Sequence, residues 1–487
     1  MLFNSLDFLI FFPIVLLVYY VIPNKIKNLW LLVASYYFYM CWNAKYAILI
    51  LASTFITYVS GLAIERWKYK KIVVALSFIS NLSILFFFKY TNFVIELING
   101  LSNSLHIMFN VPSVDILLPV GISFYTFQAL SYTMDVYRKE IYAERNFINY
   151  ALFVSFFPQL VAGPIERSKN LLKQLAVPRR FDYDLAREGL LLMIWGYFLK
   201  IVLASRLAIF VDTVYRDYEK FGGAYLIIAT MLFAVLVYCD FAGYSTIAMG
   251  AAQILGIKLM DNFNAPYLAG TVAEFWRRWH ISLTSWFKDY LYIPLGGNRK
   301  GTTRKYINKM IVFLVSGLWH GANMTFIVWG GLNGLYQVIG EITLTTRRSI
   351  KKVLGINEKS TGYKIISILI TFMLVDFSWI FFRASSYADA INIIKSIFSV
   401  HNPWILFDGS LYTCGLDYKN FGLMIVCIII LLIADVIKHK GIQIRKRVLE
   451  QDWWFRCLFF ASAIILVLLF GKWGPNFQKD SFIYFQF

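Results

Sequence analysis

The 487-residue chain is too apolar for a soluble protein: 59% of its residues are hydrophobic, 15% are charged, and its mean hydropathy is +0.60. Soluble domains average about 45–50% apolar and about 25% charged residues, so a soluble fold is excluded. The net charge of +19 comes from basic residues in short loops between apolar segments, which the positive-inside rule explains better than nucleic-acid binding. We expect an all-α polytopic membrane protein that binds no nucleic acid.

The apolar segments set the expected spans, because a crossing needs about 20 apolar residues. They are 8–22, 29–42, 46–64, 72–88, 116–134, 189–211, 224–256, 310–342, 364–382, 421–437 and 453–471. Segments 224–256 and 310–342 are too long for one span, and we expect them to turn back at 240–243 and at 320–323. Segment 147–163 carries Pro158 between basic loops, which predicts a re-entrant segment. The fold class is therefore about 11–12 transmembrane helices plus re-entrant segments.

Basic clusters predict the orientation, because cytoplasmic loops are enriched in Lys and Arg. The clusters expected inside are 25–27, 66–71, 138–145, 167–180, 277–309, 347–352 and 438–447. Both termini, including the tail 472–487, are then extracytoplasmic. Without linkers or clear repeats, we expect one membrane-embedded domain over 1–487. The five cysteines show no CxxC or Cys/His pairing, so no metal site is expected.

Two histidines stand out between residues 274 and 323. His320 lies near the middle of the uncharged apolar run 310–332, and intramembrane ionisable residues are functional candidates by default. At about 100° per residue, His280 falls on the same helical face as Trp276, Trp279 and Leu283. Both histidines are therefore expected to point into apolar surroundings.

Two imidazoles in an apolar pocket could serve catalysis. Burial would keep His320 neutral, so that it could take a proton from an acceptor hydroxyl as that hydroxyl attacks an acyl carbon. Asn323 could orient the His320 ring or donate to a developing oxyanion. The alternative is a packing histidine bonded to a carbonyl. The glycine-rich stretch 295–301 is either a flexible interfacial loop or a contact for the phosphates of a nucleotide-containing donor.

Two stretches carry a resemblance to a known family. Trp276-Arg277-Arg278-Trp279-His280-Ile281-Ser282-Leu283 and Leu318-Trp319-His320-Gly321-Ala322-Asn323 resemble the two histidine motifs of the membrane-bound O-acyltransferase (MBOAT) family. The likeness is to the bacterial branch that includes the alginate O-acetyltransferase membrane subunit and its peptidoglycan relatives. Supporting stretches are 118–127, 162–165, 261–267 and 482–487. Relatives often carry an acid where this chain has Thr246, so no catalytic role is placed there.

The resemblance implies a ring of transmembrane helices around a thinned centre, in which a tunnel joins a cytoplasmic donor funnel to an extracytoplasmic acceptor funnel. It implies His320 as the principal catalytic residue and His280 as a second one. The residues expected to line the substrate tunnel are Trp276, Arg277, Arg278, Trp279, Trp319 and Asn323. Acetyl-CoA is the expected acyl donor, and no tightly bound cofactor is expected. The expected partners are bilayer lipids, a glycan acceptor and a periplasmic SGNH-type acetyltransferase.

These expectations describe a bacterial inner-membrane enzyme that acetylates an exported polysaccharide, either an alginate-like exopolysaccharide or peptidoglycan. One alternative is D-alanyl transfer to teichoic acid from a carrier protein; the longer chain and stretches 277–283 and 296–301 favour the acetylating branch. Another is a transporter or channel, but paired transmembrane acids and an inverted repeat are missing.

The end of the chain is unusually aromatic. Residues 482–487 would expose much apolar surface in water, so the tail is expected to be buried. It is either an aromatic plug or interfacial anchor, or a segment that presents the Tyr484 hydroxyl near His320. In the second case Tyr484 would be a third catalytic residue that carries the acetyl group transiently.

Overall fold

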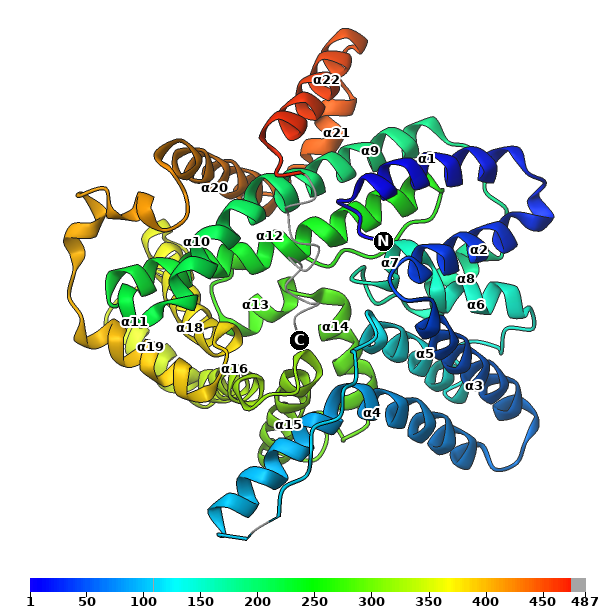
Figure 1. Ribbon diagram of the computed structural model, residues 1–487, viewed down its shortest axis with the longest axis horizontal. Helices are drawn as coiled ribbons and strands as arrows, with labels where there is room; N and C mark the ends of the chain where they lie inside the picture. The colour runs from blue at the N-terminus through cyan, green and yellow to red at the C-terminus, as the bar shows by residue number, and fades with distance from the viewer. Residues whose placement is uncertain (108, 474–487) are drawn as a thin grey trace. The chain divides into compact units, whose positions relative to one another are not determined.

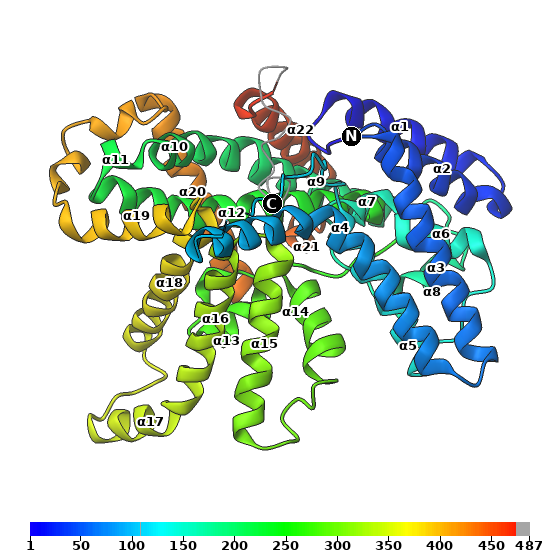
Figure 2. The same cartoon turned by 60° about the horizontal axis from the view of Figure 1, so that its bottom comes forward.

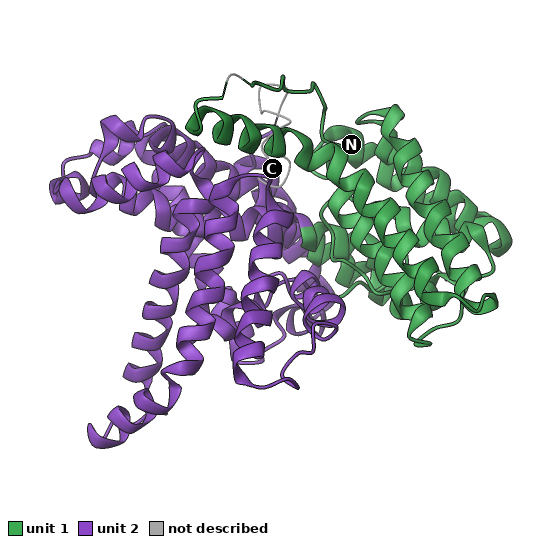
Figure 3. Cartoon of the chain, turned by 90° about the horizontal axis from the view of Figure 1, so that it is seen from below, with its two compact units in different colours: residues 1–193, 245–260 green, residues 194–244, 261–487 purple. Residues whose placement is uncertain are grey.

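The computed structural model describes residues 1–107 and 109–473. The chain divides into two compact units (Figure 3). Unit 1 comprises Met1–Met193 and Ser245–Met260, and unit 2 comprises Ile194–Tyr244 and the described residues from Asp261 onward. The expected single domain over 1–487 stays a prediction, and the tail 474–487 lies outside the described residues.

The described part of the chain is helical and contains no β-strand (Figure 1). Seven of its helices are long and apolar enough to cross a membrane: 44–66, 70–104, 183–216, 224–254, 361–383, 418–439 and 453–470. Shorter apolar helices cover Leu6–Val21 and Phe147–Leu160. The predicted all-α polytopic membrane class is confirmed. The expected number of about 11–12 transmembrane helices stays a prediction beside the seven candidate spans of the described residues.

Unit 1 is built from the N-terminal helices. They are α1 (Leu6–Val21), α2 (Lys27–Met40), α3 (Ala47–Arg66), α4 (Lys70–Ser104), α5 (Ile122–Tyr137), α6 (Phe147–Ser155), α7 (Phe157–Leu160) and α8 (Ser168–Leu175). The helix over this segment is interrupted at Phe156, between α6 and α7, while the predicted re-entrant course of 147–163 stays a prediction. Asn146 begins α6, where its side chain accepts hydrogen bonds from the backbone N–H groups of Ile148 and Asn149.

Unit 2 holds most of the remaining helices. The chain continues through α9 (Tyr183–Tyr197), a π-helix (Phe198–Ala204), α10 (Ser205–Arg216), α11 (Tyr218–Phe221), α12 (Ala224–Ile254), α13 (Val272–Arg278), α14 (Ile281–Phe287) and a second π-helix (Lys288–Tyr292). It ends with α15 (Thr302–His320), α16 (Met324–Ile342), α17 (Leu344–Val353), α18 (Thr361–Arg383), α19 (Tyr387–Ser399), α20 (Tyr418–His439), α21 (Ile444–Leu449) and α22 (Trp453–Phe470). Two of the three unit boundaries fall inside α9 and α12, and the third lies after Met260, beyond the end of α12.

The predicted reversal at 240–243 is wrong, because α12 runs without interruption from Ala224 to Ile254. Gly243 does not form a turn; it allows α12 to pack closely against the end of α9 and the π-helix that follows it. A Cβ at this position would lie 2.9 Å from the Gly196 carbonyl oxygen and 3.0 Å from the Lys200 backbone nitrogen. On the same stretch of α12, Asp240 forms a buried ion pair with Lys200 of the π-helix.

The predicted reversal at 320–323 is confirmed. Helix α15 ends at His320, Gly321 is extended, and the Asn323 side chain caps α16 by accepting from the Thr325 N–H at 3.0 Å. The two helices lie side by side (Figure 2). Gly317 and Gly330 allow this contact, since a Cβ at either position would come within 2.2–2.3 Å of a backbone oxygen of the other helix.

Candidate active site

His280 lies at the break between α13 and α14. Its backbone is left-handed, with φ = 44°, and its side chain is fully buried. The Ile281 N–H donates to the Asn262 carbonyl oxygen at 2.9 Å, which holds the start of α14 against the 261–265 segment. The prediction of one continuous helix through His280 is therefore wrong, although its conclusion that the ring is buried is confirmed.

Asn262 fixes the protonation of the His280 ring. Its Oδ1 accepts from the Ser282 N–H at 3.3 Å and the Ser282 hydroxyl at 2.8 Å, and it lies 3.1 Å from His280 Nδ1. The backbone N–H of Ser282 can only donate, so the Asn262 atom that it contacts must be the oxygen and not the amide nitrogen. Because this oxygen can only accept, Nδ1 of His280 must carry the hydrogen. Burial lowers the pKa of His280 to about 3. The ring is therefore neutral at pH 7, and its Nε2 carries a lone pair.

His320 is the last residue of α15 and is 4% exposed. Aromatic rings surround it. The Trp319 centroid lies 4.9 Å away, that of Trp329 (α16) 5.0 Å, and that of Phe382 (α18) 5.6 Å, all edge to face. The expected apolar surroundings of His320 are confirmed.

The two imidazoles are brought together within unit 2. Their ring centroids are 6.4 Å apart, and Trp319 lies 6.0 Å from His280 and 4.9 Å from His320. Phe241 of α12 packs its ring against His280 at 4.6 Å. Two buried imidazoles in an aromatic setting form a site that can exchange protons with a reacting group while water is restricted.

Trp276 of α13 and Trp279, the residue that follows this helix, support the site. The Trp276 indole N–H donates to the Asn333 side-chain oxygen at 3.2 Å, and the Asn333 amide reaches the Ser378 hydroxyl at 3.2 Å. Trp279 is fully buried, and its ring lies 5.2 Å from that of Trp379. These tryptophans tie α13 to α16 and α18, the helices that supply the rings around His320.

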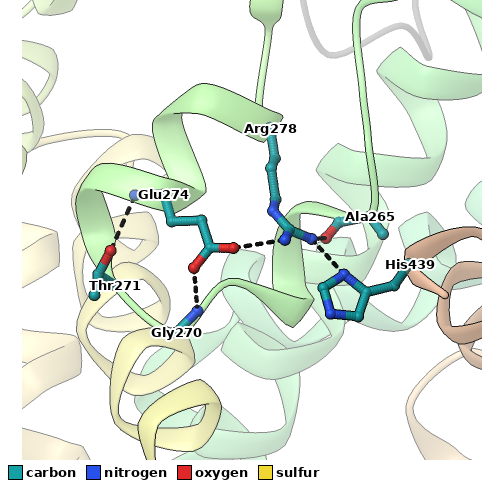
Figure 4. Close-up of polar contacts among 6 residues, drawn as sticks. All are labelled: Ala265, Gly270, Thr271, Glu274, Arg278 and His439. Carbon is teal, nitrogen blue, oxygen red and sulfur yellow. Dashed lines mark hydrogen bonds and ion pairs between the residues drawn. The ribbon is translucent and has the colours of Figure 1, made fainter. Parts of the chain in front are cut away.

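The two arginines of the first motif have different surroundings. Arg277 is exposed. Arg278 forms an ion pair with Glu274 at 2.5 Å, and its guanidinium donates to Nδ1 of His439 at 2.9 Å and towards the Ala265 carbonyl oxygen at 3.5 Å (Figure 4). Glu274 also accepts from the Gly270 N–H. Arg278 thus joins α13 to the 265–270 loop and to the end of α20.

The Asn323 side chain makes its hydrogen bonds to the backbone, and Tyr484 lies outside the described residues. The Asn323 side chain caps α16, and its amide donates to the Ser385 carbonyl oxygen at 3.4 Å. These contacts tie the turn after His320 to the end of α18, without the contact to the His320 ring that we expected. Tyr484 lies outside the described residues, so its carrier role stays a prediction.

Several residues of the site could not be singled out from the sequence. Asn262 lies in a stretch that carries the family resemblance, and that was its only signal. The aromatic residues near His320 lie in or at the end of long apolar segments: Trp329, Trp379 and Phe382. In such segments the sequence does not distinguish an aromatic residue of the site from one that only packs. In the part of the chain that the structure describes, no group of three or more His, Cys, Asp or Glu side chains could hold a metal ion.

Comparison with known proteins finds a family model and several similar proteins. The family model of MBOAT, the membrane-bound O-acyltransferase family, matches residues 15–374, a range that includes both histidines. The chain is 38% identical to the protein named probable alginate O-acetylase in Pseudomonas aeruginosa, over 82% of this chain and 75% of the relative. It is 34% identical to the peptidoglycan O-acetyltransferase of Helicobacter pylori, over 100% of this chain and 98% of the relative.

A third relative is more distant. The teichoic acid D-alanyltransferase of Bacillus subtilis is 28% identical over 55% of this chain and 69% of the relative. The more extensive matches are thus to O-acetylating proteins. Because the family model covers most of the chain and two relatives align over 82% and 100% of it, the protein belongs to the membrane-bound O-acyltransferase family.

Proposed function

We propose that this membrane-bound O-acyltransferase takes an acetyl group from cytoplasmic acetyl-CoA and passes it across the inner membrane for O-acetylation of an exported polysaccharide. The observation that carries the proposal is the pair of buried imidazoles 6.4 Å apart, enclosed by Trp319, Trp329 and Phe382. Acyl transfer to a hydroxyl needs a neutral base in a place where water does not compete for the acyl group.

In this proposal His320 is the general base. It removes the proton of the acceptor hydroxyl while the hydroxyl oxygen attacks the acetyl carbonyl carbon. The carbon–sulfur bond of the thioester then breaks, and the leaving thiolate takes the proton from the imidazolium, which restores neutral His320. The products are an acetyl ester and free coenzyme A. The lone pair on His280 Nε2 provides a second acceptor, and Asn262 holds that ring in one tautomer.

The names of the relatives support a glycan acceptor. Alginate and peptidoglycan are both polysaccharides outside the cytoplasm. Alginate appears in the name of the Pseudomonas relative, and peptidoglycan appears in the name of the Helicobacter relative. We propose an acceptor of this class, reached with a periplasmic SGNH-type acetyltransferase as partner. The basic clusters support an orientation in which residues 296–300 face the cytoplasmic donor and both termini are extracytoplasmic.

The test compares histidine variants in cells. In a bacterium that makes the glycan and lacks its own copy of the protein, the wild-type chain is expected to restore ester-linked acetate on alginate or peptidoglycan. His320→Ala should lower it about 100-fold or more, since general-base catalysis contributes about 10²–10⁴-fold. The matched control is His401→Ala, an exposed histidine, which should behave as wild type. Normal acetylation by well-expressed His320→Ala would remove this residue from the mechanism.

A further inference from the structure

Unit 1 contains a polar pocket of about 180 Å³ where the chain turns from α1 into α2. Its wall also includes residues of α6 and the end of α8, and no Asp or Glu is among the lining residues. The lining side chains with polar groups are those of Tyr19, Asn24, Lys25, Lys27, Asn28, Asn146 and Asn149. A pocket with two lysines and no acid favours an anion.

Lys27 is the most informative residue of this wall. It is 5% exposed, and its ammonium donates to the Arg179 carbonyl oxygen at 2.8 Å and lies 5.1 Å from the centroid of the Tyr19 ring. Within the described residues no carboxylate pairs with it. An ammonium has three hydrogens to donate, and a buried charge without a counter-ion is costly. An anion in the pocket would supply the missing charge.

The amides around Lys27 are already held in place. The Asn28 amide donates to the Asn149 side-chain oxygen at 2.8 Å and to the Leu175 carbonyl oxygen at 2.7 Å. Asn146 is fixed by its cap of α6. The pocket is therefore built by contacts between α2, α6 and α8.

The surface of α2 indicates what kind of anion would enter. Leu29 lines the pocket, and an exposed apolar stripe runs from it along the helix through Val33 and Tyr37. These residues are 44%, 54% and 54% exposed, and their spacing of four places them on one face. A headgroup pocket that continues into an apolar stripe matches a molecule with a charged head and acyl chains. A free phosphate compound would leave the stripe uncovered.

We propose that this pocket binds the phosphate headgroup of an anionic phospholipid, with Lys27 and Lys25 facing the phosphate and the acyl chains lying along α2. The turn 22–26 follows the apolar helix α1, and in this proposal it lies at the level of the headgroups. Its lysines belong to a basic cluster of the kind that attracts anionic leaflets. The site is independent of the proposed acetyl transfer.

Native mass spectrometry of the full-length protein in detergent tests this proposal. The probes are phosphatidylglycerol, phosphatidylcholine and free coenzyme A. The wild-type protein should retain phosphatidylglycerol in preference to phosphatidylcholine. Lys27→Met and Lys25→Gln should each weaken its retention about fivefold, the effect typical of one lysine near an anionic membrane surface. Lys25 is exposed, so Lys25→Gln remains a test if Lys27→Met does not fold.

The matched control is Lys68→Gln, an exposed lysine of unit 1 in another basic connection. It should bind phosphatidylglycerol as the wild type does. Equal retention of the two lipids, or an equal loss in Lys68→Gln, would overturn the proposal. Displacement of phosphatidylglycerol by coenzyme A would also overturn it, because the pocket would then accept a free phosphate compound.

Discussion

At the level of single residues, His280 has an unusual backbone. A left-handed conformation at a residue other than glycine costs about 1–3 kcal/mol and persists only where the surroundings enforce it. Here the surroundings are Asn262 and Ser282, whose hydrogen bonds hold both the backbone and the ring. Strain of this kind is typical of active sites, which agrees with the place of His280 beside His320.

Replacing Asn262 should therefore affect both stability and catalysis. Asn262→Ala leaves the Ser282 N–H, the Ser282 hydroxyl and His280 Nδ1 without their acceptor. We expect the free energy of unfolding to fall by about 1–3 kcal/mol and acyl transfer to slow. Thermal denaturation in detergent and turnover of the purified protein measure the two effects.

Asn264→Ala is the control for this prediction. Asn264 lies two residues after Asn262, and its side chain is exposed. A substitution at such a surface position usually changes the free energy of unfolding by less than about 0.5 kcal/mol. Unchanged stability and turnover in Asn262→Ala would contradict the role of this amide.

At the level of helices, two similar sequence patterns had different outcomes. Both long apolar segments contain a glycine near a polar residue, yet only the one at 320–323 reverses. At 320–323 the Asn323 side chain caps the new helix α16, whereas Ser245 and Thr246, which could also cap a helix, lie inside the uninterrupted α12. A capping residue near a glycine therefore does not by itself predict a reversal. Gly243 instead allows contact with the π-helix around Lys200, a tertiary effect that hydropathy does not record.

The α15–α16 contact positions His320, and a single methyl group should disturb it. Gly317→Ala would place a Cβ 2.2 Å from the Phe326 carbonyl oxygen, so the helices must move apart. Overpacking of this kind costs about 1–3 kcal/mol, and we expect a lower melting temperature and a loss of acyl transfer.

Gly331→Ala is the matched control on the facing helix. Its nearest new contact is 3.6 Å, from the Cβ to a Leu314 methyl carbon, which is ordinary van der Waals distance. This variant should be as stable as the wild type or more stable, because alanine favours helix over glycine. Equal melting temperatures for Gly317→Ala and Gly331→Ala would show that close helix contact does not set the stability of this hairpin.

At the level of the whole molecule, apolar runs and basic loops predicted most of the helices, because the bilayer imposes a minimum length and an apolar surface on each span. The same patterns did not separate the aromatic residues of the site from other aromatics. Trp329, Trp379 and Phe382 come from two helices that meet only in the folded chain. His280 and His320 could be identified because each stands beside a tryptophan in an apolar stretch, within the two motifs that resemble those of the family.

The central claim, that His320 acts in acetyl transfer from acetyl-CoA, is tested most directly by thiol release. The full-length protein is purified in lipid nanodiscs and supplied with acetyl-CoA, an alginate oligosaccharide and a muramyl disaccharide, and free coenzyme A is followed over time. We predict release by the wild type and by His401→Ala, and release at least about 100-fold slower by folded His320→Ala. Equal release by folded His320→Ala and by the wild type would contradict the claim.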